Sequence, residues 1–377
     1  MAENIKTRLR INLRREVDDS YEIEFGSNLS PDIADYLKQE GKASKYAIIT
    51  DTNVEKLHAI ELQKRLSEKG LTSNIFTFPA GEKNKTIVQC TNVIDKMSQL
   101  GYARDSYILA LGGGVVGDMA GFIAAIFNRG VPYIQIPTTV LSQADSAVGG
   151  KTGVDTEYGK NLIGAFKQPK KVFVDVATLR TLPEIEFRSG LAETIKHGVI
   201  RDANFFAYLE DNMNNILARK DEYSLEIAMQ NCRIKGEVVE IDPNERGLRR
   251  ILNYGHTIGH AIEKRSNFRL PHGFCVSIGM MAAGRIALEI GQFSKQDLQR
   301  QQELLIKAGL PLHIPQGISN KELIELTTLD KKSKNGEARY CLPVKIGKMN
   351  YFNGAYVLPI AKEFVMNALT KTRWQKE

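Results

Sequence analysis

The first 180 residues alternate short apolar segments with longer segments of helical periodicity. Apolar segments of this length, bounded by turn residues and separated by helices, are typical of parallel strands that are buried on both faces. The pattern therefore predicts a mostly parallel sheet with helices on both faces. We expect its strands at residues 45–50, 72–78, 106–111, 131–136 and 171–175.

Two stretches of this half depart from the alternation. Residues 8–12 and 21–25 are typical of short strands, and their proximity predicts a hairpin. Residues 138–166 are rich in Gly, Ser, Thr and Lys with weak periodicity, which predicts a long functional loop. Further along, apolar residues recur at intervals of three and four, as in helices. The sequence thus predicts an α/β domain over 1–180 and a mainly helical domain over 181–377.

The strand expected at 106–111 runs directly into a glycine-rich turn. Gly112, Gly114 and Gly117 satisfy the pattern G-x-G-x-x-G between that strand and the following helix. The backbone N–H groups of such a turn can hold a pyrophosphate at the helix N-terminus, as in Rossmann-like dinucleotide-binding domains. No acidic residue ends the next strand, but Asp51, after an earlier strand, can bind a ribose instead. On this motif alone, a tight turn without a ligand is the alternative.

Charge and cysteine content exclude several classes of protein. The net charge of +7 favours anionic partners, yet Lys and Arg are spread along the chain without the basic run of a nucleic-acid-binding tail. Four cysteines without a C-x-x-C pair indicate neither a zinc knuckle nor a disulfide framework. The N-terminus has no apolar signal region, and the longest apolar run, 119–127, is far shorter than the ~20 residues of a membrane span. We expect a cytoplasmic protein that binds a small anion, with no nucleic acid or membrane partner.

Three of the six histidines lie within residues 253–273. His256 and His260 are four residues apart, so on a helix they point from one face and can chelate a divalent metal. An ordinary helical histidine pair without a ligand is equally compatible with this spacing. Threonine follows His256, so the zincin pattern is absent and further ligands must come from elsewhere.

Two other stretches carry side chains that suit an anionic ligand. Among its glycines, the segment 145–166 contains Asp145, Lys151, Lys160 and Asn161. Glycines let the backbone approach a ligand, and lysines supply charge to phosphate or carboxylate. Glu193 and Lys196 follow in a helical stretch, three residues apart on one face. On spacing alone, a solvated loop and a surface ion pair are the alternatives.

Together these residues resemble one family, the 3-dehydroquinate synthases, which are the shikimate-pathway members of the sugar phosphate cyclases. The resemblance covers nearly the whole chain and is most specific in residues 112–118, 145–166, 191–198, 246–263 and 271–273. It implies an NAD-binding N-terminal domain and a C-terminal domain that binds metal and substrate, with the active site in the cleft between them. The implied cofactors are NAD and either Zn²⁺ or Co²⁺.

The resemblance also implies roles for single residues, and it divides the histidine pair. The metal ligands would be Glu193, His256 and His272, whereas His260 would face the substrate. The residues expected to bind NAD are Asp51, Asn53, Glu82, Lys85, Gly113, Gly114, Val115, Asp118, Thr138, Thr139, Lys151 and Lys160. Those expected to contact substrate and support catalysis are Asp145, Lys151, Asn161, Lys196, Lys235, Arg249, Asn253 and His260. Arg129 would reach the neighbouring site of a homodimer, and either Lys331 or Lys332 would contact substrate.

The implied reaction converts 3-deoxy-D-arabino-heptulosonate 7-phosphate into 3-dehydroquinate and phosphate, in aromatic amino acid biosynthesis. NAD would oxidise C5 transiently, phosphate would leave, NADH would return the hydride, and an intramolecular aldol reaction would close the carbocycle. Several lysines and arginines suit a substrate that carries both a carboxylate and a phosphate. The substrate's own phosphate can act as the base, so the sequence need not supply a dedicated strong base.

Three other functions are compatible with parts of this pattern. Another sugar phosphate cyclase, such as a valiolone or deoxyinosose synthase, would share the fold and the chemistry, but Asn253, His260 and the lysines at 331 and 332 resemble the dehydroquinate synthase pattern. A metal-dependent polyol dehydrogenase of the glycerol dehydrogenase type would release NADH and would not need the basic cluster. A basic nucleic-acid-binding protein would leave the histidines unexplained.

Overall fold

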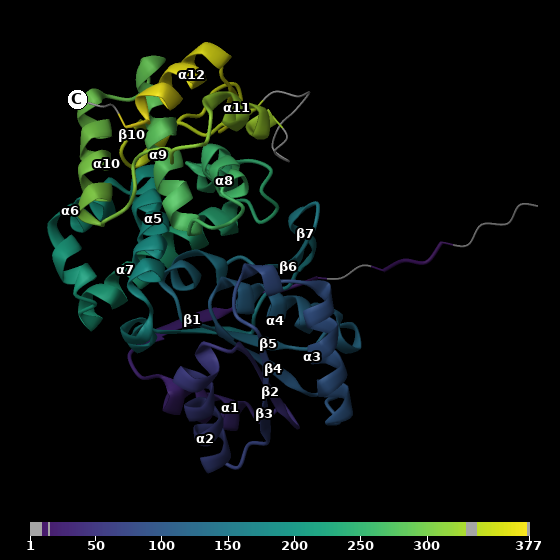
Figure 1. Cartoon of the computed structure of the whole chain (residues 1–377). Helices are drawn as coiled ribbons and strands as arrows, with labels where there is room; N and C mark the ends of the chain where they lie inside the picture. The colour runs from purple at the N-terminus through teal and green to yellow at the C-terminus, as the bar shows by residue number, and fades with distance from the viewer. Residues whose placement is uncertain (1–9, 14–15, 329–337, 375–377) are drawn as a thin grey trace, which may run out of the picture.

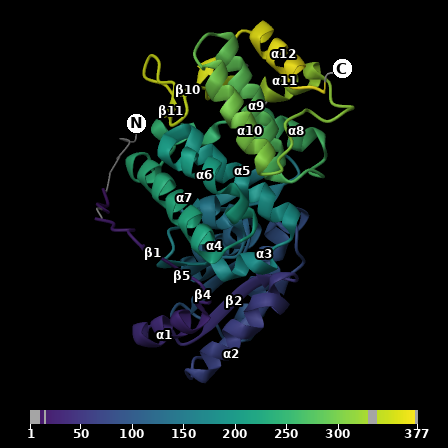
Figure 2. The ribbon, with the colours of Figure 1, turned by 90° about the vertical axis from the view of Figure 1, so that its left-hand side faces the viewer.

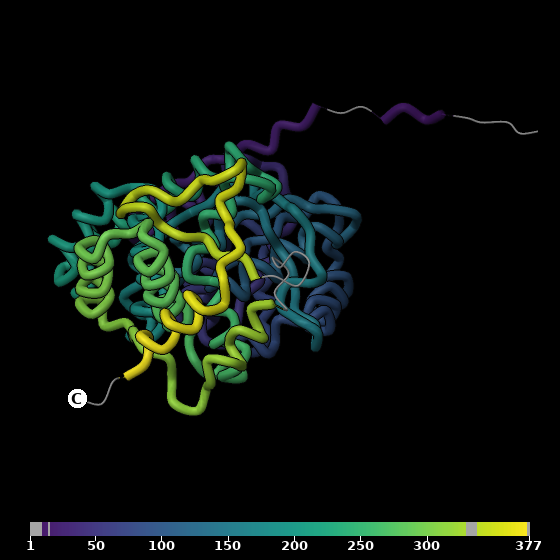
Figure 3. Tube along the Cα trace, turned by 90° about the horizontal axis from the view of Figure 1, so that it is seen from above, coloured from purple at the N-terminus to yellow at the C-terminus, as the bar shows by residue number. Residues whose placement is uncertain are grey.

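The computed structural model describes residues 10–13, 16–328 and 338–374. Figure 1 shows a sheet-containing part formed by the first half of the chain and a helical part formed by the second half. The described residues before residue 21 run away from the body of the molecule, as the view from above also shows (Figure 3). Among the described helices, none is both long and apolar enough to cross a membrane.

The N-terminal part is built around a six-stranded sheet. Its strands are β1 (Glu22–Gly26), β2 (Tyr46–Asp51), β3 (Ser73–Phe78), β4 (Tyr107–Gly112), β5 (Tyr133–Pro137) and β8 (Lys171–Asp175). Their order across the sheet is β1-β8-β5-β4-β2-β3, and every neighbouring pair is parallel. β4 and β5 are buried along their whole length, as expected of continuous apolar strands covered on both sides. The predicted parallel sheet is confirmed.

Helices cover both faces of this sheet, as the alternation predicted. They are α1 (Ser30–Glu40), α2 (Ile60–Glu68), α3 (Ile87–Gln99) and α4 (Gly114–Ile126). Successive residues of β4 point into two different cores, because side chains alternate along a strand. Ile108 and Ala110 pack with residues of α3 and α4, whereas Leu109 and Leu111 pack with residues of α1 and α2.

Two predictions for this half are wrong. Among the described residues before β1, 10–13 and 16–20, none forms a strand, and β1 instead pairs in parallel with β8, Glu22 opposite Lys171. Residues 8 and 9 of the predicted partner strand lie outside the described residues. The stretch 138–166 is not a long loop, since β6 (Lys151–Thr156) and β7 (Gly159–Phe166) form an antiparallel hairpin. Figure 1 shows this hairpin at the border between the two parts, where it rises toward α8.

The second half is mainly helical, as predicted. Its helices are α5 (Glu184–Arg201), α6 (Ala203–Leu217), α7 (Asp221–Ile241), α8 (His256–Arg265), α9 (His272–Glu289), α10 (Lys295–Lys307), α11 (Asn320–Thr328) and α12 (Lys362–Lys371). Short ladders join β9 (Arg339–Tyr340) to β12 (Leu358–Pro359) and β10 (Pro343–Lys345) to β11 (Lys348–Met349). α5 packs against α9, and α7 reaches down beside the sheet layer to contact β1 (Figure 2). α5 is buried from Ser189 to Ile200 and contacts the turn Ser142–Ser146 of the first half, so it lies where the two parts meet.

Candidate active site

Three potential metal ligands from three helices meet near this border. Glu193 of α5, His256 of α8 and His272 of α9 each bring a ligand atom within 4.8 Å of the others. Glu193 Oε1 lies 3.5 Å from His256 Nε2 and 3.7 Å from His272 Nε2. Ligands held at ~2.0–2.1 Å by a tetrahedral zinc ion lie roughly 3.3 Å apart, so the three atoms fit around one metal. Glu193 is fully buried, and its Oε1 has no hydrogen-bond partner among the described residues, a state that suits a metal ligand.

Close helix packing brings these ligands together. α8 and α9 each begin at a histidine. A Cβ atom on Gly273 would lie 1.8 Å from the carbonyl oxygen of Ser189 in α5, and one on Gly279 would lie 1.9 Å from the carbonyl oxygen of Gly255. Because only glycine permits such close approaches, these two glycines hold α9 tightly against α5 and against the start of α8.

His260 lies one turn after His256 but does not belong to the group around Glu193. Its ring centroid is 5.2 Å from that of His256 and 6.0 Å from that of His272. A second group of potential ligands brings His260 together with Glu263 and His272. The two histidines that the spacing paired are thus members of different groups, with His272 common to both.

Cationic side chains expected to bind substrate are buried beside the potential metal ligands. Lys196, Lys235 and Arg249 are 1%, 5% and 2% exposed. Lys196 contacts Glu193 Oε2, and Lys235 Nζ lies 2.8 Å from Asp145 Oδ1. Arg249 Nε has no hydrogen-bond partner within the described part of the chain. Three buried cations beside two carboxylates favour a bound anion.

Burial and charge act in opposite directions on the pKa values of this cluster. Burial alone would raise the pKa of Asp145, but Lys235 and Lys196 lower it below its usual value. Burial lowers the pKa of Lys235, and Asp145 offsets this effect only in part. Burial would likewise raise the pKa of Glu193, but Lys196 and His256 bring it well below its usual value. Both carboxylates are therefore ionised at neutral pH, and a bound anion would stabilise the Lys235 ammonium further.

The sequence did not single out two acidic residues that contact the predicted ones. Glu245, in the loop after α7, contacts Lys151 and accepts a hydrogen bond of 2.8 Å from Asn253 Nδ2. No spacing in the sequence connects Glu245 to those partners. Glu263 does have such a signal, because it follows His256 by seven residues and therefore lies on the same helical face.

Eight of the twelve residues predicted to bind NAD lie at the carboxyl ends of three parallel strands. The order of the sheet reverses between β2 and β4, and α/β sheets bind ligands at such a switch point. Cβ atoms on Gly113 and Gly114 would lie 3.1 Å from Thr139 Cγ2 and 3.2 Å from Ser146 Oγ, so larger residues would crowd the turn. Asp51 and Asn53 follow β2, Gly113, Gly114, Val115 and Asp118 follow β4, and Thr138 and Thr139 follow β5.

The hairpin β6–β7 connects this end of the sheet to the helical part. Lys85 Nζ, which also lies 2.6 Å from Asp118 Oδ2, donates a 2.7 Å hydrogen bond to Asn161 Oδ1 of β7. Lys160, the preceding residue of β7, lies 3.2 Å from Glu82 Oε1. These contacts place Asn161, expected at the substrate, directly beside residues expected at the cofactor.

Arg129, predicted to reach a neighbouring site, lies apart from these residues. Arg129 is exposed in the turn after α4, and the 13 residues of that helix put it roughly 20 Å from the glycine turn. Its φ of 65° follows a φ of 49° at Asn128 and precedes one of 116° at Gly130. Positive φ at two successive non-glycine residues is uncommon, so this turn is a strained one. Lys331 and Lys332 lie outside the described residues.

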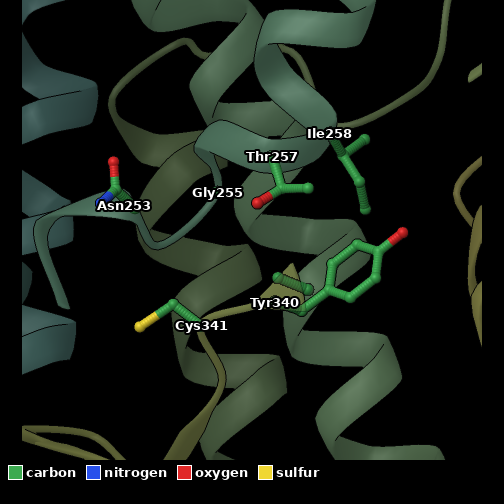
Figure 4. Close-up of a pocket in the computed structure, with 8 residues that line it drawn as sticks. Asn253, Gly255, Thr257, Ile258, Tyr340 and Cys341 are labelled. Carbon is green, nitrogen blue, oxygen red and sulfur yellow. The ribbon is translucent and has the colours of Figure 1, made fainter. Parts of the chain in front are cut away.

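A small hollow beside the start of α8 is not a substrate site. Asn253, Thr257 and Tyr340 contribute to its lining (Figure 4), and its volume is about 10 Å³. A space of that size holds at most a single water molecule. A ligand as large as a sugar phosphate does not fit into it.

Comparisons with known proteins identify the family to which the chain belongs. Residues 75–189 match the family model described as 3-dehydroquinate synthase N-terminal, and residues 190–333 match that described as 3-dehydroquinate synthase C-terminal. The 3-dehydroquinate synthase of Acetivibrio thermocellus is 45% identical over 338 residues, covering 90% of this chain and 92% of the relative. That of Desulforamulus reducens is 44% identical over 334 residues, covering 88% and 93%.

Two solved structures extend the comparison to related enzymes. A 2-deoxy-scyllo-inosose synthase complexed with carbaglucose-6-phosphate, NAD+ and Co²⁺ is 26% identical, with a TM-score of 0.86 and coverage of 93% of this chain and 96% of that one. A 2-epi-5-epi-valiolone synthase from Streptomyces hygroscopicus with NAD+ and Zn²⁺ bound is 25% identical, with a TM-score of 0.86 and coverage of 97% and 99%. On the strength of both family models and of these relatives, the chain belongs to the 3-dehydroquinate synthase family.

Proposed function

We propose that this chain catalyses the reaction for which its family is named, with NAD and a divalent metal as cofactors. The substrate would be 3-deoxy-D-arabino-heptulosonate 7-phosphate, and the products 3-dehydroquinate and phosphate. The contact between Glu193 and Lys196 is the main support for this proposal. It places the potential metal ligands directly beside the buried cations Lys196, Lys235 and Arg249. A polyol dehydrogenase would use a metal and NAD but would have no use for several buried cations. The solved relatives with NAD+ and Co²⁺ or Zn²⁺ bound support the same cofactors here.

Different side chains would bind the charged groups of the substrate and transfer protons in this reaction. When bound, the metal would lower the pKa of a substrate hydroxyl, and NAD would accept and return a hydride. Lys196, Lys235 and Arg249 would bind the carboxylate and the phosphate of the substrate, in a buried setting where charge-assisted hydrogen bonds are strong. His260 is only partly buried, so a substrate could reach its ring. The imidazole would then donate a proton to a substrate oxygen or accept one from it.

We place the domain boundary near residue 180, within the short 3₁₀ helix Val176–Thr181 that joins β8 to α5. The α/β domain over 1–180 would bind NAD at the switch point of the sheet, and the domain over 181–377 would bind metal and substrate. A cytoplasmic location is part of the proposal, since the four cysteines are free and buried, as suits a reducing compartment.

We further propose that the enzyme is a homodimer in which Arg129 completes the neighbouring site. The exposed, strained turn that carries Arg129 lies at the far end of α4 from the glycine turn, so the side chain is placed to reach outward. Sedimentation equilibrium should give twice the chain mass of 42.1 kDa. A monomer at assay concentration would contradict the dimer.

The function is tested by incubating the metal-loaded protein with the heptulosonate phosphate and substoichiometric NAD. Phosphate and dehydroquinate should form together over many turnovers without accumulation of NADH, because each hydride is returned. Stoichiometric NADH would indicate a dehydrogenase instead. Turnover of another sugar phosphate in preference to the heptulosonate would indicate a different cyclase.

A further inference from the structure

His272 lies between two carboxylates, one beside each ring nitrogen. Its Nε2 is 3.7 Å from Glu193 Oε1, and its Nδ1 is 3.5 Å from Glu263 Oε2. A histidine that binds a metal through one nitrogen commonly donates its other N–H to a carboxylate, which fixes the orientation of the ring. Glu263 is placed to receive that hydrogen bond.

We propose that Glu263 is a positioning residue that fixes the orientation of the His272 ring. Through Lys160, this effect of Glu263 depends on the position of the β6–β7 hairpin. The inference rests on the proposed metal site. Glu263 is 5% exposed, and Lys160 Nζ lies 3.0 Å from its Oε1. Lys160 Nζ also lies 3.2 Å from Glu82 Oε1. One ammonium group therefore joins Glu263, which would orient a metal ligand, to the sheet-containing part.

The surroundings of Lys160 strengthen this connection. Its ammonium group lies 4.8 Å from the centroid of the Phe268 ring, just beyond the end of α8. A cation held over an aromatic face and between two carboxylates has little freedom to move. Displacement of the hairpin would therefore move the Lys160 ammonium group away from Glu263. Glu263 and the His272 ring that it contacts would then be held less firmly in place.

Glu263 also belongs to the second group of potential ligands, with His260 and His272. The two carboxylates face different nitrogens of His272, so a metal on one side leaves the other carboxylate as the supporting partner. Glu193 Oε1 faces two imidazole nitrogens and has no hydrogen-bond partner among the described residues, which favours the metal on its side. This choice makes Glu263 the support rather than a ligand.

The experiment measures Zn²⁺ affinity by chelator competition, together with the absorption spectrum of the Co²⁺-substituted protein. Glu263→Ala should weaken zinc binding about 10–100-fold, the usual effect of losing such a partner, and should shift the cobalt bands. Glu263→Gln keeps an oxygen that can accept the Nδ1–H bond, so it should recover much of the affinity. Lys160→Met should weaken binding by less than Glu263→Ala. Lys264→Ala, an exposed change one residue away on α8, should leave both readouts unchanged.

Each outcome decides the inference. Parent-like zinc affinity and cobalt bands in a folded Glu263→Ala protein would overturn it while leaving the metal site intact. Loss of zinc in Glu263→Gln and in His260→Ala alike would also overturn it, because Glu263 would then be a ligand. A parent protein without zinc affinity would overturn the metal site itself, and this inference with it. Circular dichroism and the unfolding midpoint show whether each variant is folded.

Discussion

Glu193 is the residue on which the proposed site most depends. It is fully buried, its Oε2 contacts Lys196, and its Oε1 faces His256 and His272. A buried carboxylate without such partners would be protonated, because burial disfavours the charged form. The lysine and the histidines keep Glu193 ionised, which is the form that a divalent metal requires.

His197, four residues after Glu193, predicts a pH dependence of stability. Its Nδ1 lies 2.9 Å from Asn231 Oδ1, while Asn231 Nδ2 donates to Thr194 Oγ1, so Nδ1 carries the proton and Nε2 has no described partner. Burial lowers the pKa of His197 to about 4. Because the unfolded chain takes up a proton near pH 6.5, stability is lost as the pH falls from about 6.5 to about 4, by about 3 kcal/mol in all.

Urea unfolding of the parent and of His197→Gln at several pH values in this range measures the effect. The parent should lose more stability than the variant on acidification, since glutamine does not titrate. Equal losses in the two proteins would contradict a neutral, buried His197.

At the level of residues, the sequence predicted most of the groups that the structure brings together, but spacing alone paired two histidines that belong to different groups of potential ligands. His256 and His260 share a helical face, yet a side chain's neighbours on other helices decide which group it joins. His272 comes from a different helix, so no periodicity connects it to His256. Glu245 was missed for the same reason, because its contacts with Lys151 and Asn253 are formed across a loop.

At the level of elements, the geometry of the potential metal ligands depends on how closely α9 approaches α5. Gly273 Cα carries no side chain where the backbone of Ser189 passes, and Gly273 N donates a 3.0 Å hydrogen bond to Ser189 Oγ. His272 is the residue before Gly273, so any displacement of this end of α9 moves its imidazole away from Glu193.

Gly273→Ala should therefore lower both stability and zinc affinity. A Cβ atom 1.8 Å from a carbonyl oxygen forces the helices apart, at a cost of roughly 1–3 kcal/mol or more. Gly236→Ala is the matched control, because a Cβ there meets nothing within 4 Å in the interior of α7. It should gain roughly 0.5–1 kcal/mol from helix propensity. Thermal unfolding and chelator competition measure both variants, and parent-like zinc affinity in Gly273→Ala would contradict this role of the packing.

Most helices and strands could be predicted from local sequence patterns. The predictions that failed concern strand pairings, which local patterns do not reveal. Strands β2 to β5 were predicted because short, mostly apolar segments bounded by turn residues and separated by helices indicate parallel strands. The partner of β1 could not be predicted, since β8 lies in a distant part of the sequence. The hairpin β6–β7 was taken for a loop because its glycines and polar residues lack strand periodicity. Gly164 shows why: a Cβ there would lie 2.3 Å from the carbonyl oxygen of Thr152, so close strand pairing requires glycine.

At the level of the whole molecule, the fold alone does not decide the function. A probable glycerol dehydrogenase from Sinorhizobium meliloti is only 14% identical, with a TM-score of 0.59, and shows that the architecture is shared with other enzymes. What separates the proposed activity from a simple dehydrogenase is the buried cationic cluster of Lys196, Lys235 and Arg249 beside the potential metal ligands. Lys85 contacts Asn161 of the β6–β7 hairpin, and Lys160 of the same hairpin contacts Glu263 of α8. The hairpin thereby links the helices that carry the potential metal ligands to the end of the sheet proposed to bind NAD.

We propose that the histidine pair is divided, with His256 and His272 on the metal and His260 on the substrate. This division is tested most directly by measuring bound zinc and turnover of the heptulosonate phosphate in His272→Ala and His260→Ala. We predict that His272→Ala loses zinc and turnover together, whereas His260→Ala keeps stoichiometric zinc and loses turnover. Loss of zinc in His260→Ala with retention in His272→Ala would contradict this division of the histidines.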